Sequence, residues 1–119
     1  MTDDANRVGL LDDYQAATRR TAGTFRTSET ALTCWSLGLC GESGEFADVV
    51  KKWIFHGHDL PPNKLADELG DVLWYVAAAA DALGYPLSVI AERNIAKLRA
   101  RYPDGFSSER SINRQESPL

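Results

Sequence analysis

Two pairs of acidic residues carry the chemistry that this sequence suggests. Glu42 and Glu45 are three residues apart, and Glu68 and Asp71 repeat that spacing. Residues three apart in a helix are neighbours on its surface, and like charges there repel. Moving an uncompensated ion out of water would cost on the order of several kcal/mol in addition to this repulsion. The pairs therefore predict a cation between them.

Nearby basic residues do not supply that cation. Of these acids, Glu68 alone has a Lys or Arg three or four positions away, namely Lys64. A di-iron site would require a histidine within each pair, but His56 and His58 lie beyond the second expected helix. Oxygen-only ligation favours Mg²⁺, with Mn²⁺ as a possible substitute, over Zn²⁺ or Cu²⁺. The predicted ligands are Glu42, Glu45, Glu68 and Asp71. A carboxylate that is not fully committed to the metal could accept a proton from metal-bound water, and Glu45 is the candidate for this general base.

Magnesium held by carboxylates usually shares its remaining positions with water and substrate phosphate. A basic helix near the C-terminus could hold phosphate oxygens, because Asn94, Lys97 and Arg101 share one face. The alternative is a solvated basic face. Lys52 is a further candidate for phosphate, or it pairs with Asp48 four residues before it.

Four helices are expected to position these residues, because breakers separate four stretches of helical periodicity. The expected ranges are 10–22, 28–55, 63–83 and 86–102. Ser28 and Asn63 are possible N-caps, and Gly84 is a C-terminal stop. Since no stretch reads as a strand and the loops are short, the fold class is all-α, a four-helix bundle with antiparallel neighbours.

The second expected helix has an apolar stripe with a 3-4 spacing, which faces a partner helix. Glu42 is the exception within this stripe, while Trp35 and Trp53 are expected to pack in the core. Gly44 and Gly70 each precede the second acid of a pair. Glycine costs about 1 kcal/mol in a helix interior, so its recurrence suggests close backbone approach or a need for room.

Trp74 lies three residues after Asp71. It is a candidate for stacking on a base, although buried aromatic residues mostly pack.

Length and charge limit the other possibilities. The chain has 119 residues and a net charge of −4, which suits one domain and argues against broad binding to nucleic acid or an anionic membrane. We expect a helical domain over 1–106 and a polar tail over 107–119. No signal peptide or membrane span is recognisable, and Cys34 and Cys40 form no metal-binding motif. The expectation is a cytoplasmic protein with free thiols.

At residue level the chain resembles the MazG-like nucleotide pyrophosphohydrolases, an all-α superfamily. The matching residues are the Glu42/Glu45 pair, the Glu68/Asp71 pair after a gap, and Asn94, Lys97 and Arg101 near the end, within roughly 29–106. This resemblance implies a helical protomer that assembles as a homodimer or homotetramer, with sites at or near subunit interfaces.

The resemblance also implies Mg²⁺-dependent cleavage of a nucleoside triphosphate between the α- and β-phosphates. The products would be a nucleoside monophosphate and pyrophosphate, in a role in nucleotide-pool cleaning. The four acids would bind the metal, Lys97 and Arg101 would neutralise phosphates, and Asn94 would assist. The alternative function is a non-catalytic nucleotide-binding or regulatory helical oligomerisation module. A purely structural bundle is a third possibility.

Overall fold

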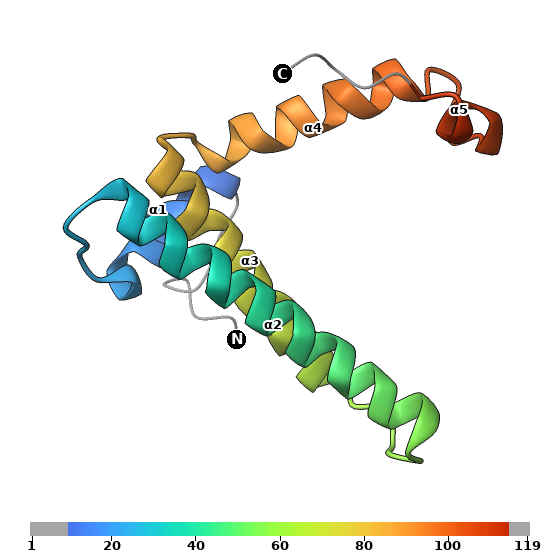
Figure 1. Ribbon diagram of the computed structural model, residues 1–119, viewed down its shortest axis with the longest axis horizontal. Coiled ribbons are helices and arrows are strands. Elements are labelled where there is room, and N and C mark those ends of the chain that lie inside the picture. The colour runs from blue at the N-terminus through green and yellow to red at the C-terminus, as the bar shows by residue number, and fades with distance from the viewer. Residues whose placement is uncertain (1–9, 115–119) are drawn as a thin grey trace.

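The structure is a computed structural model that describes residues 10–114. The fold is all-α, as predicted, and consists within that range of five helices shown in Figure 1. They are α1 (Leu11–Ala22), α2 (Ser28–Phe55), α3 (Pro62–Leu83), α4 (Leu87–Arg101) and α5 (Ser108–Ile112). The first four agree with the expected ranges to within a residue. The fifth lies inside the segment expected to be a polar tail.

The helix ends follow local backbone rules. Gly84 ends α3 with a left-handed φ of 78°, and its N–H donates to the carbonyls of Ala80 and Asp81. The predicted N-caps are wrong in detail. The side chain of Thr27, not Ser28, caps α2 by accepting a hydrogen bond from the N–H of Thr30 at 3.1 Å. Helix α3 begins with proline at its first turn, so Asn63 lies inside the helix.

Helices α2 and α3 form an antiparallel pair that is the centre of the molecule (Figure 1). Near the start of α2 and the end of α3, the Trp35 ring packs against Phe25, Trp74 and Tyr75, with centroids 5.0–6.1 Å away. Gly38 permits this approach, because a Cβ at that position would overlap the Tyr75 ring. Helices α2 and α3 are therefore in tight contact at Gly38, which precedes the first acidic pair along α2.

Helix α1 packs on α3 and holds the start of α4. The Ser88 N–H donates to Asp12 at 2.9 Å and its hydroxyl donates to the same carboxylate at 2.7 Å. The Arg19 guanidinium donates to both oxygens of Asp81, at 2.9 and 2.7 Å. These contacts place α1 across the end of α3 from which α4 departs.

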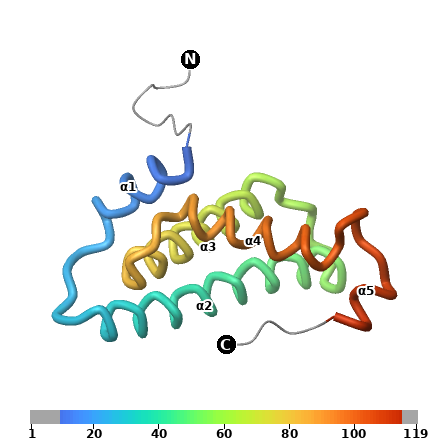
Figure 2. Tube along the Cα trace, turned by 90° about the horizontal axis from the view of Figure 1, so that it is seen from above, coloured from blue at the N-terminus to red at the C-terminus, as the bar shows by residue number. Residues whose placement is uncertain are grey.

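The prediction that neighbouring helices are antiparallel is wrong for α3 and α4. The chain turns by 100° between them, and α4 projects away from the α2–α3 pair in Figure 1. The view from above in Figure 2 superimposes α3 and α4, although Figure 1 shows that they diverge. Because three residues separate α3 from α4, the sequence predicts that α4 begins close to the end of α3. It does not predict the direction of α4, which the contacts with α1 fix.

Many large apolar side chains of this single chain remain exposed. Trp53, expected in the core, is 38% exposed, so that expectation is wrong for the isolated chain. Leu69 and Leu73 on α3 and Ile95 and Leu98 on α4 are between 40% and 53% exposed. Within residues 10–114 no single helix has the length and apolar character to cross a membrane, and α3 with α4 meets that test only as a bent pair.

Candidate metal centre

Three of the four predicted metal ligands converge between α2 and α3. Glu42 on α2 and Glu68 and Asp71 on α3 each offer a carboxylate oxygen, and these oxygens all lie within 4.8 Å of one another. The convergence follows from the antiparallel pairing of the two helices, which sets both acidic pairs at the same level. Such a set of oxygens lies within reach of one divalent cation.

Glu45, the fourth predicted ligand, faces the same cluster from one turn further along α2. It is exposed and is not among the three convergent acids. However, it interacts with both Glu42 and Glu68, because its charge and hydrogen bonding raise the pKa of each. Glu45 therefore lies at the open edge of the cluster.

The electrostatics of the cluster show an uncompensated negative charge. Burial, then a hydrogen bond with Glu45 and then the surrounding carboxylates raise the pKa of Glu42 from 4.5 to about 7. The pKa of Glu68 is raised as well, first by burial and then by the charge of Glu45. No basic side chain is among the causes for either group, so no cation within residues 10–114 offsets the repulsion.

Two carboxylate oxygens of the cluster are buried without a hydrogen-bond partner among the described residues, Oε2 of Glu42 and Oε2 of Glu68. Buried polar atoms normally have a partner. An all-oxygen donor set with unsatisfied lone pairs fits Mg²⁺, and it does not fit a metal that prefers nitrogen or sulfur.

Tyr14 on α1 is a neighbour of the cluster that was not predicted from the sequence. Burial and then the charge of Asp71 raise the pKa of its phenol. The sequence carries only a weak indication that Tyr14 lies beside the acids, because a tyrosine on the apolar side of an amphipathic helix usually packs in the core.

A hollow of about 360 Å³ adjoins the acids. Gly41 and Gly44 line it together with Glu45 and Glu68. A Cβ at Gly41, Gly44 or Gly70 would meet nothing within 4 Å, so these glycines leave room beside the acids. Of the two reasons expected for the recurring glycines, this agrees with the need for room. The close backbone approach occurs one turn earlier instead, at Gly38.

Lys52 and Lys64 contribute positive charge to this hollow. Lys52 Nζ lies 2.9 Å from Asp48, and Lys51 Nζ lies 3.0 Å from the same carboxylate. These two hydrogen bonds, that of Lys52 first, lower the pKa of Asp48 to about 2. Lys52 thus forms the ion pair expected as the alternative to phosphate binding, while still lining the hollow.

The predicted phosphate ligands of α4 lie away from the acids of the same chain. Lys97 and Arg101 line a separate cavity near α5, and Asn94 is exposed on α4 and lines neither cavity. The structure therefore brings the acids together but does not bring the α4 cations to them.

Trp74 is engaged in packing. Its indole N–H donates to Thr21 Oγ1 at 3.0 Å, and its ring packs edge-on against Trp35 at 5.2 Å and Tyr75 at 5.0 Å. Cys34 and Cys40 are free thiols, as expected, and both are exposed.

Comparison with known proteins agrees with this geometry. Residues 30–106 match the MazG nucleotide pyrophosphohydrolase domain, a range that includes both acidic pairs and the α4 cations. The Gene 37 protein of Mycobacterium phage L5 is 36% identical over 113 residues, which cover 87% of this chain and 98% of the relative. No solved structure matches significantly. The chain therefore belongs to the MazG nucleotide pyrophosphohydrolase domain family.

Proposed function

We propose that the protein is a Mg²⁺-dependent nucleoside triphosphate pyrophosphohydrolase that releases a nucleoside monophosphate and pyrophosphate, in a role in nucleotide-pool cleaning. The observation that supports this most is the convergence of Glu42, Glu68 and Asp71 with no compensating cation among the described residues. Membership of the MazG family supports the same reaction class.

Glu42, Glu45, Glu68 and Asp71 would hold Mg²⁺, or Mn²⁺ in its place. When bound, such an ion activates water and stabilises negative charge on phosphate. Glu45 is the candidate general base, because its exposed position at the edge of the cluster leaves it able to accept a proton from water. The open hollow beside Gly41 and Gly44 gives a phosphate chain access to the acids.

The phosphate-binding residues of this proposal are Asn94, Lys97 and Arg101, with Lys52 at the hollow. Since α4 turns away from α3 by 100°, we propose a homodimer or homotetramer in which α4 of one copy meets the acids of another. Opposite charges on α4 and on the acid cluster support this arrangement, as do the exposed apolar side chains of Leu69 and Ile95.

A pyrophosphate-release assay tests the activity. The expected result is turnover of at least one triphosphate with Mg²⁺ and none with EDTA, across a panel of canonical, deoxy and damaged nucleotides. Absence of turnover throughout, together with calorimetric binding of a non-hydrolysable analogue, would instead identify a non-catalytic nucleotide-binding module.

A further inference from the structure

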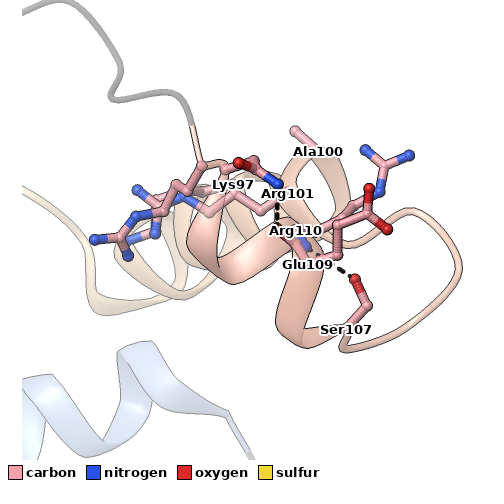
Figure 3. Close-up of a pocket in the computed structure, with 8 residues that line it drawn as sticks. Lys97, Ala100, Arg101, Ser107, Glu109 and Arg110 are labelled. Carbon is pink, nitrogen blue, oxygen red and sulfur yellow. Dashed lines mark hydrogen bonds between the residues drawn. The ribbon is translucent and has the colours of Figure 1, made fainter.

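A strongly basic cavity of about 650 Å³ lies between the C-terminal end of α4 and α5, as Figure 3 shows. Its charged lining consists of Lys97 and Arg101 from α4, Glu109 and Arg110 from α5, and Arg114. Four cations thus surround the cavity with one acid. Volumes of this size are usual for small-molecule sites.

The chain is folded back at Pro103–Phe106 in a way that brings Arg110 to this cavity. The Gly105 N–H donates to the Tyr102 carbonyl at 3.1 Å, and Gly105 has a φ of 91°, which glycine adopts without strain. The Phe106 ring packs on Tyr102 at 5.4 Å. Ser107 then caps α5 by accepting a hydrogen bond from the Arg110 N–H at 3.1 Å (Figure 3).

Three of the cations that line this cavity form no ion pair within the part of the chain that the structure describes. Among residues 10–114, no ion pair joins Lys97, Arg101 or Arg110 to a carboxylate. Three such cations around one cavity repel each other, and an anion would offset that repulsion. Guanidinium groups match phosphate oxygens with paired hydrogen bonds, so polyphosphate is the anion that this lining favours.

We propose that the α4–α5 cavity binds the polyphosphate chain of the nucleotide, with Arg110 as a substrate-binding residue that α5 supplies. This inference rests on the proposed function and extends it, because it adds α5 to the site. In the proposed oligomer, the cavity of one copy presents phosphates to the acids of another, and α5 forms its outer wall.

Calorimetric titration with inorganic tripolyphosphate in EDTA tests the cavity without relying on turnover. Arg110→Gln is expected to bind about tenfold more weakly, the loss typical of one charge-assisted hydrogen bond. Arg110→Lys keeps the charge without the planar fork, so it should fall between. Arg99→Gln is the matched control, because Arg99 is an exposed α4 arginine that lines a different hollow.

Several outcomes would overturn the cavity assignment. They are no binding by the wild type, equal losses in Arg110→Gln and Arg99→Gln, and failure of a non-hydrolysable triphosphate analogue to displace tripolyphosphate. Circular dichroism of each variant confirms that α-helical content is retained. Tight tripolyphosphate binding without any Mg²⁺-dependent turnover would support the cavity and contradict the proposed function, so the two failures are distinguishable.

Discussion

Gln15 and Leu87 are joined by a hydrogen bond that ties α1 to the first residue of α4. The Leu87 N–H donates to Gln15 Oε1 at 2.8 Å, while the amide nitrogen of Gln15 donates to the Tyr85 carbonyl at 3.0 Å. The Gln15 side chain is 1% exposed. One buried amide therefore satisfies a backbone group within the α3–α4 break and another at the start of α4, and it fixes the direction in which α4 leaves.

Replacing Gln15 by leucine is expected to destabilise the protein by about 2 kcal/mol, because the Leu87 N–H and the Tyr85 carbonyl lose their partner. Urea denaturation followed by circular dichroism measures the change. Asp13→Asn, at an exposed position of α1, should stay within about 0.5 kcal/mol of the wild type. Equal stability of Gln15→Leu and wild type would contradict the structural role given to this amide.

Gly38→Ala and Gly41→Ala form a matched pair on α2. The new methyl group at Gly38 would overlap the Tyr75 ring, and overpacking of this kind costs about 1–3 kcal/mol. At Gly41 it would meet nothing within 4 Å, so the helix propensity of alanine should stabilise α2 by up to about 1 kcal/mol. Thermal denaturation of both variants checks the opposite signs. Stabilisation by Gly38→Ala would show that α2 and α3 are further apart.

Glu42→Gln is expected to raise the Tm of the metal-free protein at pH 8 and to abolish its stabilisation by Mg²⁺. The amide removes one of the repelling charges and one of the predicted ligands. In the wild type, Mg²⁺ at 100 times its Kd would add about 2.7 kcal/mol by mass action. Asp67→Asn, one residue before Glu68 and exposed, should keep the full Mg²⁺ shift. A Mg²⁺ response that survives in Glu42→Gln would contradict the metal site.

The stability of the metal-free protein is expected to fall as pH rises from about 4.5 to about 7. The pKa of Glu42 is raised from 4.5 to about 7, so the folded protein holds this proton more tightly than the unfolded chain does. The resulting stabilisation is complete below pH 4.5 and is lost through pH 7. Because Mg²⁺ displaces the proton, its stabilising effect should grow over the same range. Scans of Tm against pH, with and without Mg²⁺, measure both trends, and a metal-free Tm that rises between pH 5 and 7.5 would count against them.

Glu45→Gln and Asp71→Asn are expected to abolish turnover while leaving helicity intact. Loss of a general base typically reduces the rate by about 10²–10⁴-fold, and loss of a ligand removes the metal that the reaction requires. Pyrophosphate release and far-ultraviolet circular dichroism check activity and folding separately. Asp67→Asn, an exposed acid of α3 outside the acid cluster, is a control that should retain turnover. Wild-type rates in the first two variants would refute the site assignment.

The helices and the meeting of the acidic pairs could be predicted from the spacing of residues along the chain. Glycine and proline set the ends of α2 and α3 through local backbone preferences, as Gly84 illustrates. Helices α2 and α3 pair antiparallel across the short connection between them, as predicted, and that pairing brings Glu42 level with Glu68 and Asp71. The helix ends depend on local backbone preferences, and the meeting of the acids depends on the pairing of two helices that follow each other in the chain. The spacing of residues was therefore enough to predict both features.

Features that depend on contacts between distant segments could not be predicted from residue spacing. The direction of α4 depends on Gln15, 72 residues before Leu87, and no periodicity within α4 records that bond. Trp74 packs because Thr21 and Trp35 meet it across the fold. Arg110 reaches the basic cavity through the turn that ends at Phe106. A hydrophobic pattern specifies which face of a helix is buried, whereas the partner and the crossing angle arise only when all the segments pack together.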